Sequence, residues 1–241
     1  MYLRFVYKHI QMTNAVSKPV GEEILKKAPG TPIEFISMGV NAEVFKPVAN
    51  ARDQLGFNDD IKVLLFVGRI GKKKGIDELV KAMPRILQVY PNTILVIIGP
   101  GNLSSELNQY ISEYKLNDQI IPKGMIPNQY LPVYYSAADL MILPSVESIE
   151  GKEGLPVTIM ESLCCGTPVV TTPVGGSRQY SDLQSVTFCR AGDSSDLADK
   201  VIRVLGHQSL TQDQIVKEGN RFSISHIAEK YMHIYKRLVN C

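Results

Sequence analysis

The chain has 241 residues, of which 44% are hydrophobic and 21% are charged, and its formal net charge at pH 7 is +2. These proportions are typical of a folded globular protein and exclude a disordered or collagen-like chain. Because the charge is small and no long basic block is present, nucleic acid is not expected as a partner. The longest apolar runs, at 62–68 and 93–99, are too short to cross a bilayer as a helix.

The cysteines and the first residues favour a cytoplasmic protein. Charged residues interrupt the apolar stretch at 1–12 and no small-residue cleavage site is present, so a signal peptide is not expected. The cysteines lack C-x-x-C spacing and are expected to be free thiols in a reducing compartment. They are Cys164, Cys165, Cys189 and Cys241.

The N-terminal part contains a strand-like segment near residue 13, a helical segment at 17–28 and a second strand-like segment at 33–41. These elements are too few to close a sheet of their own. We therefore expect residues 1–47 to be the tail of a preceding domain together with a hinge.

From residue 61 onward, short β-branched runs alternate with longer amphipathic stretches. Strands are expected at 61–68, 93–99, 119–126, 139–145, 167–172 and 185–190, and helices at 76–90, 104–116, 129–138, 155–165 and 194–206. Ser104 is positioned to cap the second helix, and Pro84 predicts a kink or break in the first. This alternation predicts an α/β fold with a Rossmann-like parallel sheet and helices on both faces. Ligands of such sheets bind at the carboxyl ends of the strands, where the strand order reverses.

The last segment, 223–239, places its apolar residues on one helical stripe that needs a surface to pack against. The chain thus divides into an N-terminal tail and hinge (1–47), a ligand-binding Rossmann-like domain (48–218) and a C-terminal helix (219–241).

The first candidate loop, FVGRIGKKKG (66–75), connects a strand to a helix. Gly68 lets the backbone approach a ligand, and Arg69 and Lys74 place cations beside a helix start, which would favour a diphosphate. A solvated basic turn, with Lys72 and Lys73 at the surface, explains the same residues. The loop matches neither the P-loop nor the G-x-G-x-x-G pattern, which argues against kinases and dehydrogenases.

The second candidate loop, GPGN (99–102), follows a buried strand. Gly99 and Gly101 either make room for a ligand or simply form a tight turn.

The third candidate stretch, EGKEGLPVTIMESLCC (150–165), carries Glu153 and Glu161 on either side of a helix start. The two carboxylates are an acid/base pair, ligands for sugar hydroxyls, or ordinary helix residues, with Glu161 facing solvent. The N–H groups near Leu155 and Val157 could meet phosphate oxygens. The residues alone leave these alternatives open, and no metal-ligand cluster is found.

Five stretches occur together in the order and spacing of one family. They are FVGRIGKKKGIDELVKAM, ILVIIGPG, GMIPNQYLPVYYSAADLMILPS, EGLPVTIMESLCCGTPVVTTPVGG and AGDSSDLADKVIRVL. On these motifs, from about Val16 to Tyr235, the chain resembles the retaining nucleotide-sugar glycosyltransferases of the "glycosyl transferases group one" type, which have the two-domain GT-B architecture. The resemblance implies sugar transfer from a nucleoside-diphosphate sugar, as in polysaccharide biosynthesis, without a metal or other cofactor.

The resemblance also implies roles for individual residues. Arg69 and Lys74 would hold the donor diphosphate and offset charge on the departing nucleotide. Glu153 and Glu161 match the ends of a Glu-x7-Glu motif and would contact the donor sugar and the ribose, respectively. The resemblance further implies that Met125 and Ile126 border the base, and that backbone groups of Gly154, Leu155, Pro156 and Val157 touch the phosphates and sugar. The other implied donor contacts are Gly68, Gly99 and Gly101.

Three departures from the family pattern qualify these roles. Ser177, Arg178 and Gln179 stand where Pro-Glu commonly follows VGG, the loop at 145–154 is longer than usual, and most of an N-terminal acceptor domain is missing. The acceptor is expected to be a saccharide or lipid-linked glycan, and the missing domain would allow peripheral association with the inner face of a membrane. An isolated nucleotide-sugar-binding module and a GT-B-shaped epimerase are the alternatives.

Overall fold

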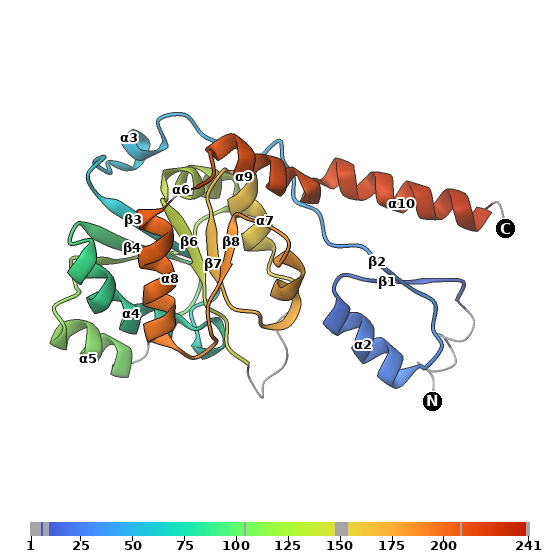
Figure 1. Cartoon of the computed structure of the whole chain (residues 1–241), viewed down its shortest axis with the longest axis horizontal. Helices are drawn as coiled ribbons and strands as arrows, with labels where there is room; N and C mark the ends of the chain where they lie inside the picture. Colours follow the sequence, from blue (N-terminus) through green and yellow to red (C-terminus); the bar gives the residue numbers. More distant parts are fainter. Residues whose placement is uncertain (1–5, 7–9, 104, 148–153, 208, 240–241) are drawn as a thin grey trace.

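The computed structural model describes residues 6, 10–103, 105–147, 154–207 and 209–239. Its main feature is a six-stranded parallel sheet with the order β5-β4-β3-β6-β7-β8 (Figure 1). The strands are β3 (Lys62–Val67), β4 (Thr93–Ile98), β5 (Ile120–Gly124), β6 (Leu140–Leu143), β7 (Val169–Thr171) and β8 (Val186–Phe188). The expected α/β fold with a Rossmann-like parallel sheet is therefore confirmed.

Helices cover both faces of this sheet. They are α3 (Ala51–Leu55), α4 (Ile76–Val89), α5 (Ser105–Glu113), α6 (Leu131–Ala137), α7 (Val157–Cys164), α8 (Ser194–Gly206) and α9 (Gln212–Gly219). Helix α4 packs against α5 and α8, whereas α6 packs against α3 and α7, and α7 against α9. Right-handed crossovers that run in opposite directions from β3 place these two groups on opposite faces.

The core lies in the central strands. Leu64, Phe66, Ile97 and Ile142 are all 0% exposed, as expected for strands that are covered on both faces. Each such side chain contributes roughly 1.5–3 kcal/mol through burial of apolar surface. Helix α4 runs unbroken through Pro84, so the expected break is absent.

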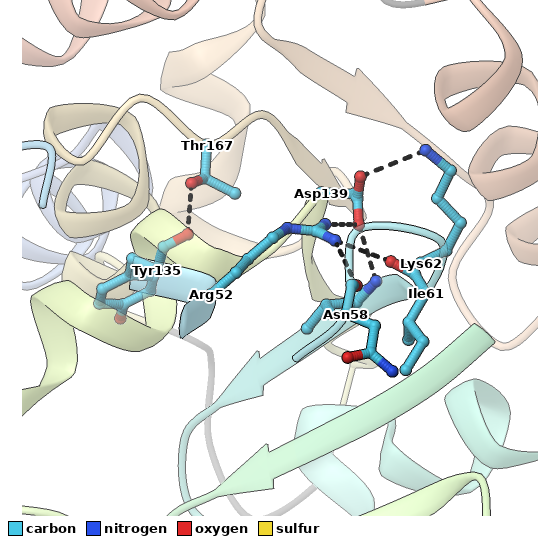
Figure 2. Close-up of polar contacts among 8 residues, drawn as sticks. Arg52, Asn58, Ile61, Lys62, Tyr135, Asp139 and Thr167 are labelled. Atoms are coloured by element: carbon cyan, nitrogen blue, oxygen red, sulfur yellow. Dashed lines mark hydrogen bonds and ion pairs between the residues drawn. The ribbon is translucent and has the colours of Figure 1, made fainter. Parts of the chain in front are cut away.

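A charged cluster connects the amino ends of β3 and β6 (Figure 2). The Asp139 carboxylate accepts hydrogen bonds from Arg52 Nη2 at 2.5 Å and from the Val63 backbone N–H at 2.7 Å, with Lys62 Nζ at 3.4 Å. Arg52 Nη1 also donates to the carbonyl of Ile61 at 2.9 Å. Because Arg52 belongs to α3, this cluster ties that helix to the sheet at the edge opposite the strands' carboxyl ends.

The N-terminal part forms a second, much smaller unit. Strands β1 (Thr13–Ala15) and β2 (Ile33–Phe35) pair in parallel and flank α2 (Lys18–Lys27). The last helix, α10 (Ile224–Val239), extends from the six-stranded unit over these strands (Figure 1). Its stripe is only partly covered, because Ile227 and Ile234 are buried against Ile36 while other apolar side chains stay exposed.

Two further expectations can be compared with the described residues. Cys164, Cys165 and Cys189 are buried free thiols, as expected, whereas Ser104 and Cys241 lie outside the described residues. Among the helices that the structure describes, none is long and apolar enough to cross a membrane.

Candidate functional site

The strand order reverses between β3 and β6. From β3 the chain proceeds to β4 and β5 in one direction, then returns to β6 on the other side of β3. Ligands of doubly wound sheets bind at the carboxyl ends of the strands beside such a reversal, so we expect a binding crevice at this point, bordered by the loops that follow β3 and β6. The first two candidate stretches and the start of the described part of the third lie at this edge of the sheet.

Two glycines let these loops approach one another at the backbone. A Cβ atom on Gly75 would stand 1.9 Å from the carbonyl oxygen of Pro144, and one on Gly99 would stand 1.9 Å from that of Gly68. Both glycines have positive φ angles, +68° and +144°, which other residues rarely adopt. Close backbone packing therefore explains glycine at both positions.

Gly101 and the residues after β5 continue this edge. Gly101 has a φ of +114° and lies close to the carbonyl of Ile70. The Gly99 N–H donates to the Gly124 carbonyl at 2.8 Å, which links the β4 loop to the β5 loop. Beyond it, the Met125 side chain is 78% exposed, and Ile126 is half-buried against the core.

The predicted cations lie in the loop after β3. Arg69 is exposed, and Lys74 is half-buried at the end of a short 3₁₀ helix, η1 (Lys72–Lys74). Val146, after β6, donates its N–H to the carbonyl of Lys73 at 3.0 Å. This bond fixes the cationic loop to the other side of the crevice. Lys72 is exposed as expected, but Lys73 is half-buried, which corrects its assignment to the surface.

The start of α7 faces the same edge without a capping side chain. Pro156 is the N-cap residue, and the first turn carries no acidic residue. The preceding segment is anchored, since the Gly154 carbonyl accepts the Gly176 N–H at 2.8 Å. Leu155 and Val157 are half-buried on either side of the buried Pro156. An uncapped helix start offers N–H groups and a positive dipole end to an anion.

Glu161 lies one turn into α7 and is only 8% exposed. Its Oε2 accepts a hydrogen bond from the Tyr135 hydroxyl at 2.8 Å. Burial raises the pKa of the Glu161 carboxyl, and the hydrogen bond from Tyr135 opposes part of that rise. The interpretation of Glu161 as a solvent-facing helical residue is therefore wrong. Glu153, its expected counterpart, lies outside the described residues.

The sequence did not predict three residues around the candidate site. Tyr135 is one, because nothing in YYSAA distinguishes it from an ordinary core tyrosine. Ser145 and Ser177 are the others: both are 0% exposed, and neither hydroxyl has a hydrogen-bond partner among the described residues. Ser145 could have been found from its position directly after a buried strand. In the turn that departs from the family pattern, Arg178 is exposed and its Nε donates to the Pro173 carbonyl at 2.7 Å.

The doubly wound parallel sheet defines a Rossmann-like α/β domain, a class in which ligands bind at the switch point. The family described as "Glycosyl transferases group 1" matches residues 47–221. This chain belongs to that family.

Individual proteins agree with this assignment. An uncharacterized glycosyltransferase of Methanocaldococcus jannaschii is 32% identical over 234 residues, which is 92% of this chain and 58% of that protein. The crystal structure of the C-terminal domain of the group 1 protein LpcC from Francisella tularensis has a TM-score of 0.64 at 26% identity, covering 80% of this chain and 98% of that one. HepE from Anabaena, solved in complex with UDP, has a TM-score of 0.84 at 19% identity, covering 98% and 66%, and shows likeness of fold alone.

Proposed function

We propose that the protein transfers a sugar from a nucleoside-diphosphate sugar to a saccharide or lipid-linked acceptor with retention, and that residues 48–218 bind the donor. The observation that carries this proposal is the buried carboxylate of Glu161 on α7, the helix with the uncapped start. Its Oε2 accepts a hydrogen bond from the Tyr135 hydroxyl at 2.8 Å. A carboxylate at this position can accept both hydroxyls of a ribose, while the helix start receives phosphate oxygens.

The cations complete the donor site in this proposal. Departure of the nucleotide leaves negative charge on its diphosphate, which prearranged cations stabilise in the transition state. Arg69 and Lys74 supply that charge in place of a metal. Glu153 contacts the hydroxyls of the donor sugar, and Met125 and Ile126 border the base.

The acceptor side is proposed to involve the rest of the protein. The chain spans 58% of the length of its Methanocaldococcus jannaschii relative. Residues 1–47 and the helix in 219–241 would join the donor domain to an acceptor domain. That domain would close the crevice and allow the cytoplasmic enzyme to associate with the inner face of a membrane.

Calorimetry with UDP-, GDP- and ADP-sugars tests donor binding by the chain. Glu161→Ala should weaken binding of the preferred donor at least about tenfold, since two hydrogen bonds to the ribose are lost. Glu218→Ala is the matched control. Glu218 accepts the N–H groups of Gln184 and Ser185, each at 3.0 Å, at the amino end of β8, away from the crevice. The control should lose stability but keep its affinity, and unchanged affinity in Glu161→Ala would refute the ribose role.

The coverage of its relatives favours a second candidate, in which the 241-residue chain binds the donor but does not transfer the sugar. A product assay with a panel of saccharide acceptors, alone and with an acceptor domain supplied in trans, separates the two. Transfer by the chain alone would exclude the binding-module alternative.

A further inference from the structure

Tyr135 does more than fill the core. Its side chain is 0% exposed on α6, yet its hydroxyl reaches α7 and donates to Glu161 Oε2. A phenol has one proton to donate, so this bond occupies one oxygen of the carboxylate. No other described residue donates a hydrogen bond to the Glu161 carboxylate, which leaves Oε1 available.

We propose that Tyr135 is a positioning residue, whose hydroxyl orients the Glu161 carboxylate so that Oε1 receives the hydroxyls of a nucleotide ribose. This inference rests on the proposed function, because it assumes that the crevice binds a nucleotide. It adds a specific claim: discrimination between ribose and deoxyribose depends on a residue that does not touch the ligand.

Tyr135 is itself held on two further sides. The Thr167 hydroxyl, after α7, donates to the Tyr135 carbonyl (Figure 2). The Phe45 ring packs edge-on against the Tyr135 ring, with centroids 6.2 Å apart and an interplanar angle of 63°. A donor fixed by its neighbours loses little freedom when a ligand binds, which favours a preorganised site.

The protonation states of the surrounding groups suit this role. Burial, and next the nearby Glu161, raise the pKa of Tyr135 well above its usual value, so the phenol remains a donor at physiological pH. The other titratable groups facing Glu161 are the Cys164 and Cys165 thiols, whose pKa values are also raised by burial, that of Cys164 to about 11. Of the groups that face Glu161, the Tyr135 hydroxyl is therefore the one that stabilises the Glu161 carboxylate in its ionised form, which accepts hydroxyl hydrogen bonds.

The test compares wild type with Tyr135→Phe, using the full chain and calorimetry with UDP, GDP and ADP and their 2′,3′-dideoxy forms. Tyr135→Phe should bind the preferred ribonucleotide about tenfold more weakly while its affinity for the dideoxy form is unchanged. The acid limb of the pH profile should also change: weakening of ribonucleotide binding on acidification should begin at a higher pH in the variant, because the bond that lowers the pKa of Glu161 is gone.

Ser162→Ala is the matched control. Ser162 neighbours Glu161 on α7, is 0% exposed, and donates a hydrogen bond to the Thr167 carbonyl at 3.0 Å. Its loss should lower stability without changing the ratio of ribo- to dideoxynucleotide affinity. A double-mutant cycle adds a second measurement: in a Glu161→Ala background, Tyr135→Phe should have no further effect on ribonucleotide binding.

The outcomes separate the inference from the function on which it rests. Failure of wild type to bind any of the nucleotides overturns both. Suppose that wild type prefers the ribonucleotide. If Tyr135→Phe keeps that preference, or weakens the binding of the ribonucleotide and of its dideoxy form equally, only the positioning role is overturned. A Tyr135→Phe effect that persists undiminished in the Glu161→Ala background likewise overturns it.

Discussion

The six-stranded unit and the N-terminal part with α10 bury their apolar residues to very different extents. Strands β3, β4 and β6 are covered on both faces, and their side chains are almost completely buried. Within the described residues of the smaller part, the hydrophobic cluster contains three buried side chains, Ile36, Ile227 and Ile234. Large hydrophobic side chains that it leaves exposed are Leu25, Phe35, Met38, Ile224, Met232 and Tyr235.

This difference shows that amphipathic patterning stabilises a unit only when enough layers are present. A two-stranded sheet with one helix on it cannot exclude water from both of its faces. The six-stranded unit carries the whole candidate site, and the smaller part meets it where α2 packs on the 3₁₀ helix η3 (Gly175–Tyr180). The two regions should therefore respond differently to matched substitutions.

The largest expected effect is the loss of a central core side chain. Leu64→Ala should destabilise the protein by about 3–5 kcal/mol, because β3 cannot collapse around the cavity. Ile234→Ala, in the small cluster, should cost about 1 kcal/mol or less in the main transition, since water already reaches its surroundings. Urea unfolding measures both, and equal costs would mean that the two regions form one cooperative core.

A pair of glycines separates backbone contact from backbone strain. Gly75 and Gly124 have φ angles of +68° and +67°, but only Gly75 has a backbone atom within reach of an added Cβ. Gly124→Ala should therefore cost only the strain, about 1–2 kcal/mol, while Gly75→Ala should cost at least twice that and also weaken nucleotide binding. Similar thermal shifts for the two variants would show that the contact with Pro144 relaxes easily.

Ion pairs provide a third comparison between the regions. Asp139→Asn should cost about 1–3 kcal/mol, because it breaks a largely buried network and leaves Arg52 without its carboxylate. Glu34→Gln breaks the ion pair between Glu34 and Arg237, whose side chains are 38% and 54% exposed, respectively. Because this pair is exposed, its loss should cost about 0–1 kcal/mol. Unfolding in low and high salt checks this, with only the Glu34 pair expected to be sensitive to screening.

The smallest effect concerns the stability cost of the candidate site itself. The pKa of Glu161 is raised above its ordinary 4.5, which means that folding favours the protonated carboxyl over the ionised one. The resulting contribution to the free energy of unfolding is fully present below pH 4.5 and is lost as the pH rises through the folded-state pKa. Glu161→Gln should therefore raise the melting temperature slightly at pH 8 but not at pH 4, while weakening nucleotide binding. A pH-independent difference would indicate that packing, not ionisation, sets this cost.

Much of the fold could be predicted because its signals are local. The apolar runs that became β3 and β4 and the stripe of α4 are readable from periodicity, and the predicted ranges agree with the observed elements to within a few residues. Of the kink or break expected at Pro84, the break is absent, because buried residues on both sides of it, Val80 and Ile86, hold α4 against the sheet. Local propensity was overridden there by packing.

The candidate site was predicted less completely. The loops after β3, β4 and the α7 start were found from glycines, cations and carboxylates, which are chemically conspicuous. Tyr135 was not found, because its partner Glu161 is 26 residues away and joins it only through the packing of α6 on α7.

By itself, the sequence of this protein determined the alternation of strands and helices, the parallel sheet and the family, since each depends on residue types at short spacings. Only the tertiary structure decided that β3 lies beside β6, that Gly75 lies against Pro144, and that Glu161 is buried against a tyrosine. Those facts depend on close packing between distant segments, which a local pattern does not encode.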